Sequence, residues 1–460
     1  MPTECIQDSF EFGTVDGREV VGKFDGGVIS SDAGALLLGQ ASRATGIVRQ
    51  FARCFSDARV PEAIEHSVET LVGQRIFGLA LGYEDLNDHD QLRHDPVLAV
   101  LAGKLAAGRN DCAPLAGKST LNRLELSRAD HTTRYCKIGH DPEAIERLAV
   151  TLFLDAEPQP RGPIILDLDA THSILHGEQE GRFFSGFYDC YCYLPLFIFC
   201  GRHLLAAKLR RASADAADGA LEEVRRIVAQ IRERWPNMAI WLRADSGFCR
   251  DDLMTWCEDN AVDYVFGLAR NKRLVRQIGR ELRTAKRKAA RTGAPARVYK
   301  ELRYATRETW SKRRRVVAKA EWTQGEANPR FVVTSLGLER AKTRFLYEDV
   351  YCQRGDMENR IKECQRDMFA DRMPAATMRV NQLRLWFSCM AYILMCALRR
   401  IALAGTKLAT ATCATIRLRL LKIGAQVTVS VRRVKIAFAS SFPMQRIFAI
   451  AHDRLCKAAR

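Results

Sequence analysis

Hydrophobic positions along the chain follow two periods, and the change between them marks its organisation. Within the first 155 residues, stretches such as AGALLLGQASRATGIV place apolar residues three and four apart, which predicts amphipathic helices. From Pro163 the pattern becomes that of strands. IILDL, YCYLPLFIFC (191–200) and HLLAAKLR (203–210) are apolar runs separated by turn residues. We therefore expect a mainly helical N-terminal region followed by a sheet whose first three strands form an antiparallel meander.

A further strand, helix and strand extend this sheet. Residues 215–235 have helical spacing and end before Pro236, and AIWLRADSGF then predicts a fourth strand. The helix DDLMTWCEDN separates it from a fifth strand, VDYVFGLA. Strand–helix–strand units are almost always right-handed crossovers between parallel strands, so these two strands should be parallel. The predicted fold class is α/β, with a mixed sheet and helices packed on it.

Composition changes again after residue 270. AKRKAAR and SKRRRVVAKAEW are strongly basic, and VYKELRYAT and RFVVTSL alternate as exposed strands do, which predicts a basic β-rich insertion over 271–345. A helical pattern returns afterwards and includes the most apolar run of the chain, 386–398. That run is shorter than the roughly 20 residues of a membrane span, so it is interpreted as a core helix.

Charge and cysteine usage narrow the class of partner. The chain has 71 Lys and Arg against 54 Asp and Glu, a net charge of +17, which favours a polyanionic partner such as nucleic acid. Its 15 cysteines include no CxxC pair, so neither a zinc site nor a disulfide framework is predicted. The N-terminus has no secretory pattern. We expect a cytoplasmic, nucleoid-associated protein with no membrane partner.

Acidic side chains stand at two predicted strand ends. In PIILDLDATHSI, Asp167 and Asp169 project to the same side of their strand because side chains alternate with period two. Asp245 follows the fourth strand, and sites in open α/β sheets assemble at the carboxyl ends of strands. Burying an unpaired carboxylate is costly, so something must neutralise these charges. A metal ion is the leading candidate.

A third acid, Glu358, lies in the segment YEDVYCQRGDMENRIKECQ. If this segment is helical, one face presents Tyr351, Arg354, Glu358 and Lys362, an acid flanked by two cations. Converging carboxylates suit Mg²⁺, with Mn²⁺ expected to substitute, and paired ions can drive in-line displacement at phosphorus. Arg354 and Lys362 would then hold phosphate oxygens. The alternative is that the strand-end acids are turn formers and the helical face is a solvated stripe of ion pairs.

The ordered set of segments resembles the DDE-type transposases of bacterial insertion sequences, in the group with a β-rich insertion before the last acid. The matches are DLDAT, RADSGF and Tyr351-x2-Arg354-x3-Glu358, and GGVISSDAGALLLGQ and GYEDLNDHDQLRHDP extend the resemblance over nearly the whole chain. The lysine of the group's third motif falls on Gln365. Lys362, one helical turn after Glu358, is the substitute, and either residue can make the terminal-phosphate contact.

The resemblance implies a ribonuclease H-like core with Asp169, Asp245 and Glu358 as catalytic, metal-holding acids. Asp169 is preferred because the resemblance places the first acid two residues before the threonine, and Asp167 is the alternate. Tyr351, Arg354 and Lys362 become the DNA-phosphate contacts. The implied reaction is Mg²⁺-dependent cutting and joining of terminal inverted repeats, with double-stranded repeat and target DNA as partners and a homodimer in the synaptic complex.

Five regions follow from pattern and resemblance together: a DNA-end-binding helical region, two parts of the catalytic core around the insertion, and a basic helical C-terminal region. Their bounds are 1–155, 156–270, 271–345, 346–400 and 401–460. Arginine-rich patches near 283–291 and 312–315, interleaved with Tyr299, Tyr304 and Trp310, predict contact with the DNA backbone. The alternatives to a transposase are a structure-selective nuclease on the same core and an inactive DNA-binding derivative.

Overall fold

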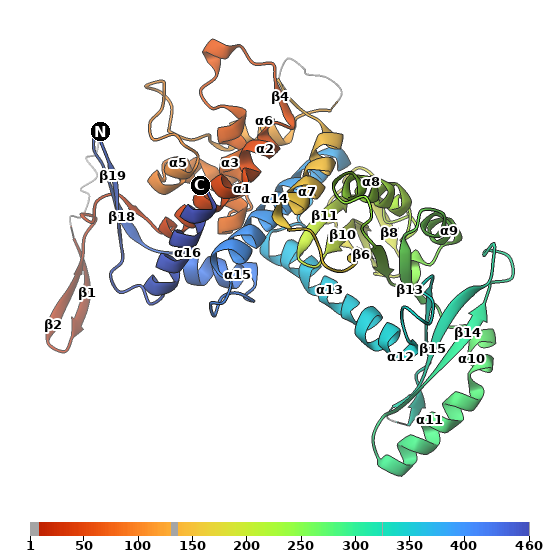
Figure 1. Ribbon diagram of the computed structural model, residues 1–460. Coiled ribbons are helices and arrows are strands. Elements are labelled where there is room, and N and C mark those ends of the chain that lie inside the picture. The colour runs from red at the N-terminus through yellow and green to blue at the C-terminus, as the bar shows by residue number, and fades with distance from the viewer. Residues whose placement is uncertain (1–8, 130–136, 324, 460) are drawn as a thin grey trace. The chain divides into compact units, whose positions relative to one another are not determined.

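The computed structural model describes residues 9–129, 137–323 and 325–459 (Figure 1). The chain forms two compact units. The first comprises residues 1–126, 132–138 and 397–460, and the second comprises residues 127–131 and 139–396. The first unit therefore contains both ends of the described chain, and the second contains every candidate site residue.

Short helices make up most of the first unit. Its principal helices are α1 (Leu36–Thr45), α2 (Ile47–Ala52), α3 (Val68–Leu81), α5 (Pro96–Leu101), α6 (Lys118–Glu125) and the C-terminal α16 (Gln445–Ala458), which packs on α1. Strand β3 (Ile29–Ser30) pairs with β18 (Ala425–Val429), which pairs in turn with β19 (Val434–Phe438). A further hairpin, β1 (Phe10–Val15) with β2 (Arg18–Gly22), precedes them.

A buried charge cluster joins the two sequence-distant parts of this unit. Asp32 accepts hydrogen bonds from the hydroxyl of Tyr83 at 2.7 Å and pairs with the ammonium of Lys422 at 2.6 Å. Lys422 also contacts the Tyr83 hydroxyl at 3.1 Å. Since Asp32 is 1% exposed, the lysine supplies the neutralising charge that a buried carboxylate requires. The N-terminal motif that contains Asp32 thus has a structural role.

The second unit is built on one large mixed sheet. Its order is β11-β10-β6-β12-β13-β17-β15-β14, with the short β16 (Glu326–Ala327) paired to β15. The strands are β6 (Ile164–Ala170), β10 (Leu196–Cys200), β11 (His203–Lys208), β12 (Ile240–Ala244), β13 (Asp263–Leu268), β14 (Ala296–Tyr304), β15 (Arg314–Thr323) and β17 (Arg330–Thr334). Strand β10 is antiparallel to β6 and β11, while β12 is parallel to β6 and β13. This topology confirms the expected mixed, ribonuclease H-like sheet and its parallel crossover.

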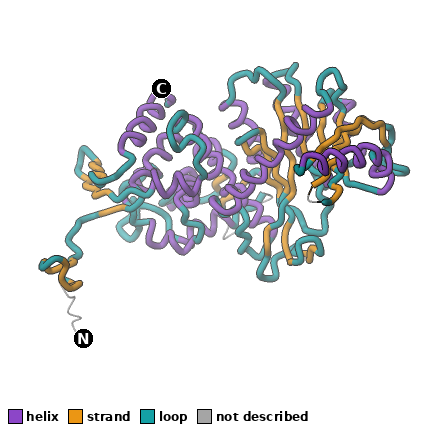
Figure 2. Tube along the Cα trace, turned by 90° about the horizontal axis from the view of Figure 1, so that it is seen from below, coloured by secondary structure: helices purple, strands orange, loops and turns teal. Residues whose placement is uncertain are grey.

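Helices cover both faces of the sheet (Figure 2). One face packs against α7 (Pro142–Ala156), α8 (Ala220–Arg234) and α9 (Asp251–Asp259) through a continuous apolar core. On the opposite face, a second core joins Val265 and Val332 to Val350 of the helical segment 343–367. Even-numbered side chains of β6 face the first core, so Asp167 and Asp169 point toward the helical segment.

The predicted strand over 191–200 is wrong, because it divides into two strands. Strand β9 (Cys190–Tyr193) belongs to a small sheet with β7 (Ser173–Ile174) and β8 (Phe183–Ser185), and β10 begins only at Leu196. Between them lies Pro195, which has no N–H to donate to a ladder. The apolar run is continuous in sequence, but the chain changes sheets at this proline.

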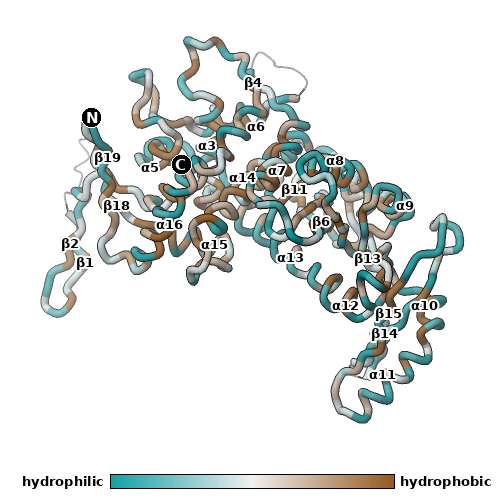
Figure 3. Tube along the Cα trace, viewed as in Figure 1, coloured by the Kyte–Doolittle hydropathy of each residue, from teal (hydrophilic) through white to brown (hydrophobic). Residues whose placement is uncertain are grey.

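The basic segment after residue 270 contains helices that the sequence analysis did not assign. They are α10 (Lys272–Gln277) and α11 (Gly279–Thr292), and α11 packs along β14 and β15. Figure 3 shows α11 as mostly hydrophilic. Strands β14, β15 and β17 continue the main sheet beyond β13. The insertion is therefore a helix-covered extension of the core sheet.

Among the described residues, the helix α14 (Met378–Ala402) alone is long and apolar enough to cross a membrane by length and composition. Seventy-eight per cent of its most apolar window is buried inside the protein. Its Tyr392 ring meets Phe199 of β10 edge-on at 6.0 Å between centroids. This burial is that of the core helix expected over 386–398.

Candidate active site

Asp167 and Asp169 lie two residues apart on β6 and have different surroundings. Both carboxylate oxygens of Asp167 accept hydrogen bonds from Arg243 on the neighbouring strand β12, at 2.5 and 2.8 Å. The same guanidinium donates to the carbonyl of Val350 at 2.6 Å. Asp167 is 4% and Arg243 6% exposed, so this is a buried, bidentate ion pair. The geometry gives Asp167 a structural role and leaves Asp169 as the site acid.

Asp169 stands at the carboxyl end of β6 beside the helical segment. Its Oδ2 accepts a hydrogen bond from Nη1 of Arg354 at 3.1 Å, and its Oδ1 accepts one from the N–H of Ala170. Burial raises the pKa of Asp169 to about 6. Arg354 opposes that shift, while the charges of Asp245 and Glu358 add to it. Asp245 and Glu358 are therefore both close enough to Asp169 to disfavour its charged form.

Asp245 follows β12 and caps the short helical turn Ser246–Phe248. Its Oδ1 accepts a hydrogen bond from the N–H of Gly247 at 2.8 Å. Gly267 of β13 passes close behind this turn. A Cβ added to Gly267 would lie 2.6 Å from the hydroxyl oxygen of Tyr351 and 2.9 Å from the nitrogen of Ser246. A hydrogen at this position is what allows Tyr351 to lie beside the strand end that presents Asp245.

The helical segment that carries the third motif is irregular. It runs through α12 (Thr343–Phe345), a π-helical stretch Leu346–Tyr351, a 3-10 turn Cys352–Arg354, α13 (Gly355–Lys362) and a second π-helical stretch Glu363–Asp367. Nη2 of Arg354 lies 3.3 Å from Oε1 of Glu358, four residues on. Arg354 thus connects Glu358 on the helix with Asp169 on the sheet. Single π-helical turns of this kind are frequent at functional sites.

The two candidates for the terminal-phosphate contact differ in their surroundings. Lys362 is exposed and forms no ion pair with any residue in the described ranges. The side-chain amide of Gln365 donates to the carbonyl of His172 at 3.1 Å and so fastens the helical segment to the loop after β6. Lys362 is therefore the residue that is free to contact a ligand.

A polar cavity of about 400 Å³ lies beside Asp245 and Arg354. The charged and hydroxyl groups on its wall come from the strand ends and from the third motif. They belong to Asp245, Ser246, Arg270, Arg330, Tyr347, Tyr351 and Arg354. Two further arginines thus border a cavity that already contains a motif arginine and a site acid, and such a lining suits an anionic group such as a phosphate.

The donor chemistry of the three acids fits a divalent cation. Carboxylate oxygens are the ligands that Mg²⁺ prefers. Burial is the main cause of the raised pKa of Asp169, and the charges of Asp245 and Glu358 add to it, so a bound cation would favour the deprotonated carboxyl. Within the described ranges, no group of three or more His, Cys, Asp or Glu side chains already converges closely enough to hold an ion. The guanidinium of Arg354 provides the positive charge between Asp169 and Glu358.

The basic patch expected near 312–315 is divided between exposed and buried side chains. Arg314 is 3% exposed and pairs with Asp251 and Glu258, and Arg315 pairs with Glu301. Lys312 and Arg313 are exposed, and Lys312 pairs with Glu258 at 2.8 Å. Of the interleaved aromatic residues, Tyr304 and Trp310 are buried against each other, and Tyr299 donates its hydroxyl hydrogen to Glu348. The buried arginines are neutralised internally, and contact with the DNA backbone stays a prediction for the exposed part of the patch.

Arg243 and Gly267 shape the site, but the sequence did not lead us to predict a role for either residue. Arg243 stands two residues before Asp245, so the period of two that paired Asp167 with Asp169 also places it on the same face of the sheet. The pairing of β6 with β12, which the sequence analysis did not predict, then brings Arg243 opposite Asp167. Nothing local marks Gly267, whose requirement arises from a residue 84 positions away in the chain.

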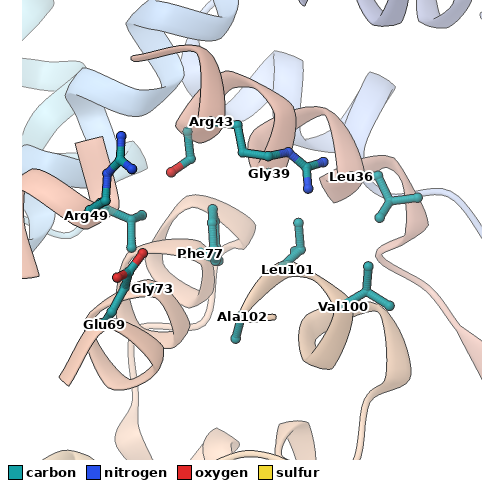
Figure 4. Close-up of a pocket in the computed structure, with 12 residues that line it drawn as sticks. Leu36, Gly39, Arg43, Arg49, Glu69, Gly73, Phe77, Val100, Leu101 and Ala102 are labelled. Atoms are coloured by element: carbon teal, nitrogen blue, oxygen red, sulfur yellow. The ribbon is translucent and has the colours of Figure 1, made fainter. Parts of the chain in front are cut away.

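A second cavity, of about 240 Å³, lies within the first unit (Figure 4). Phe77, Val100 and Leu101 form apolar parts of its lining, while Arg43, Arg49 and Glu69 contribute charges. It contains no pair of carboxylates and no nucleophile with an activating base. The chemistry predicted from the sequence therefore belongs to the second unit.

Comparison with known proteins identifies the family. A family model described as Transposase DDE domain group 1 matches residues 12–460. No curated protein sequence matches the chain. Among solved structures, a piggyBac transposase synaptic complex with hairpin DNA aligns with a TM-score of 0.39 and 12% identity, covering 85% of this chain and 80% of that chain. Because the family match spans nearly the whole sequence, this chain belongs to the Transposase DDE domain group 1 family.

Proposed function

We propose that this DDE transposase cuts the terminal inverted repeats of an insertion sequence and joins the cut ends to target DNA. The observation that carries the proposal is the arrangement around Arg354. This side chain touches Asp169 and Glu358, and Asp245 contributes to its electrostatic environment. On this proposal, acids from two strand ends and one helix converge on a single cation-binding position when a divalent ion is bound.

In the proposed reaction, Asp169, Asp245 and Glu358 hold divalent ions, Mg²⁺ in the first instance. When bound, such ions lower the barrier to in-line displacement at phosphorus by stabilising the attacking and leaving oxygens. The carboxyl of Asp169 must lose its proton to act as a ligand. Arg354, released from Asp169, is placed to hold a non-bridging phosphate oxygen, and Tyr351 and Lys362 contribute the further phosphate contacts.

The exposed face of α11 supports a role in binding the DNA backbone. Arg280, Arg283, Arg287 and Arg291 follow one another by three, four and four residues, which places them on one face of the helix. All four are exposed, and none forms an ion pair with another described residue. In α8, by contrast, Glu223 pairs with both Lys208 and Arg226. An arginine stripe without internal partners is suited to phosphates.

Substitution of Asp245 tests the catalytic assignment. Asp245→Asn keeps the shape of the turn and removes one ligand charge, so cleavage of terminal-repeat DNA should fall at least about a thousandfold. Binding of the same DNA in the absence of divalent ions should stay within about threefold of wild type, since that binding rests on phosphate contacts elsewhere. Unimpaired cleavage by the variant would refute the assignment.

Supplying pre-cut ends separates transposition from simple nuclease action. A transposase joins a pre-cut repeat end to target DNA in the presence of Mg²⁺, producing a covalently longer strand on a denaturing gel. A structure-selective nuclease with the same core shortens strands but forms no such product. An inactive derivative binds the ends and does neither.

A further inference from the structure

An aromatic cluster is exposed on the small hairpin formed by β8 and β9. Phe187 at the hairpin tip is 88% exposed, and the flanking strands expose three more rings to about half. These are Phe183 at 51%, Tyr191 at 48% and Phe184 at 44%. Phe184 meets Tyr191 at 5.4 Å between ring centroids, while Phe183 lies on the opposite face of the strand. Exposed apolar side chains are common singly, but four exposed rings on one short element indicate a binding surface.

The hairpin that presents these rings is anchored at its base. Ser173 and Ile174 of β7 pair with β9, and the N–H of Leu175 donates to the carbonyl of Tyr191 at 2.9 Å. Tyr193 of β9 is fully buried and donates its hydroxyl hydrogen to the carbonyl of Glu180. Because β7 lies just three residues past β6, the hairpin is held at the carboxyl end of the strand that carries Asp169.

Ring contacts continue from the tip of the hairpin to the loop after β6. Phe187 meets Tyr188 edge to face at 4.8 Å, and Tyr188 stacks on His172 at 4.2 Å with 26° between the rings. His172 is three residues after Asp169. Burial raises the pKa of the Tyr188 phenol, and the charges of Asp169 and Asp245 contribute to that shift. The innermost ring of the series therefore lies close to the acids.

We propose that this cluster, with Phe187 at its tip and Tyr188 and His172 beneath, is a stacking surface for unpaired nucleobases at the DNA end being processed. The inference rests on the proposed function. Every nucleobase has an apolar π-face that stacks on an aromatic ring without regard to sequence, and each stack contributes appreciably to binding of single strands. A paired base inside a duplex offers no such face, so the surface discriminates frayed from fully paired ends.

The place of these rings in the fold favours an unpaired nucleobase, and not a second copy of the chain, as the partner of this surface. A face that packs against a second copy of the chain needs no connection to the acids, whereas these rings continue from an exposed tip to within three residues of Asp169. Arg182 lies over the Tyr191 ring at 4.9 Å and adds positive charge on the same hairpin. A nucleotide has a base that can stack on the rings and a phosphate that can contact the cation, so this combination of groups suits it.

The test measures binding of two DNA ends in EDTA, which prevents cleavage. One is a blunt terminal-repeat duplex, and the other is the same duplex with three unpaired nucleotides at one 3′ end, including the fluorescent base 2-aminopurine. The variants are Phe187→Ala, Phe187→Trp and the control Phe438→Ala, which removes a 37%-exposed phenylalanine from the other unit, outside the predicted DNA-end-binding region. Affinity, 2-aminopurine quenching and the oligomeric state of each free protein are recorded.

Phe187→Ala should weaken binding of the frayed end by about five- to twentyfold and abolish quenching, while the blunt duplex changes by less than about twofold. Phe187→Trp should retain quenching, and Phe438→Ala should behave as wild type. Equal losses on both ends, or no loss on either, would overturn the inference. A change in the oligomeric state of Phe187→Ala with no selective loss would assign the surface to a second copy instead.

Failure of the proposed function would be recognised separately. If the wild-type protein neither cuts nor joins repeat DNA in Mg²⁺ but still quenches 2-aminopurine through Phe187, the stacking surface stands and the catalytic proposal fails. If cleavage and joining proceed while Phe187→Ala discriminates between ends as wild type does, only the stacking surface is refuted.

Discussion

At the scale of single residues, Asp167 and Asp169 share a strand and a face, and burial raises the pKa of both, but their partners differ. Asp167 is neutralised by a bidentate partner, Arg243, in a buried pair. Asp169 is raised in pKa to about 6, chiefly by burial, so its charged form carries a free-energy cost in the ion-free protein. The same substitution at the two positions should therefore have opposite effects on stability.

Asp167→Asn should lower the free energy of unfolding by about 3 kcal/mol, because it leaves the Arg243 charge buried without its partner. Asp169→Asn should raise it by about 1–2 kcal/mol at pH 8, because it removes a charge whose burial is unfavourable. Urea-denaturation midpoints in EDTA measure both effects. A stabilised Asp167→Asn together with a destabilised Asp169→Asn would reverse the two assignments.

The raised pKa of Asp169 also predicts how the protein responds to pH. Between its ordinary value of 3.8 and about 6, this carboxyl binds more proton in the folded than in the unfolded chain. Its contribution to stability is therefore complete below pH 3.8 and is lost as the pH rises through 6. Divalent ions require the deprotonated form, so Mn²⁺ affinity should fall about tenfold per pH unit below 6. An affinity that stays constant between pH 5 and 7 would contradict this prediction.

Gly267 tests the packing behind the site. Gly267→Ala would place a methyl group 2.6 Å from the Tyr351 hydroxyl oxygen, and we expect cleavage to fall by about 10- to 100-fold as Tyr351 and the Asp245 turn shift. Removing that hydroxyl with Tyr351→Phe in the same chain should recover part of the loss. Gly162→Ala is the matched control, because a Cβ there meets nothing within 4 Å. Equal losses for both alanine variants would exclude the steric explanation.

At the scale of helices and strands, the sequence correctly predicted those elements whose residues show a local apolar pattern. The strands of the core, the α8 region and the parallel β12–β13 pair follow from apolar period, strand length and the handedness of crossovers. The split of the 191–200 run at Pro195 and the helical state of 279–292 were missed. In the first case two strands in different sheets share one apolar run, and in the second a basic helix has only Ala285 fully buried, so its sequence shows no apolar face.

The candidate site was predictable to a similar extent. Asp169, Arg354 and Glu358, named from strand ends and helical spacing, are brought together by hydrogen bonds and ion pairs. Only the tertiary structure distinguishes basic side chains that are paired inside the protein from those that are exposed and unpaired. The four arginines on α11 form no ion pair with another described residue, whereas Arg314 pairs with Asp251 and Glu258 of α9, and no local pattern distinguishes the two.

The arginine stripe of α11 leads to a prediction about salt dependence. Replacing Arg280, Arg283, Arg287 and Arg291 by glutamine should reduce the slope of log affinity against log salt by up to about four, one for each lost phosphate contact. The loss should be the same for repeat and unrelated duplexes, since backbone contacts do not read sequence. Replacing four arginines elsewhere provides the control, and an unchanged slope for the α11 variant would exclude this helix from the DNA interface.

At the scale of the whole molecule, the features discussed above are distributed unequally between the two units. The acids, the aromatic hairpin and the arginine stripe all belong to the second unit. In the first, the Asp32–Tyr83–Lys422 cluster fastens the N-terminal motifs to the C-terminal region. We propose that joining two ends requires two chains, and the mass of the complex on repeat DNA should correspond to two proteins and two ends. A complex of one chain with one end that still supports joining would exclude the dimer.

Anomalous X-ray diffraction from crystals grown with Mn²⁺ and terminal-repeat DNA would show whether Asp169, Asp245 and Glu358 together hold the divalent ions. We expect one or two anomalous peaks bounded by these three carboxylates. Arg354 should have moved from Asp169 to a phosphate, and the Asp167–Arg243 pair should be intact. Peaks at other residues, or a bound ion that leaves any of the three acids without a role, would contradict this expectation.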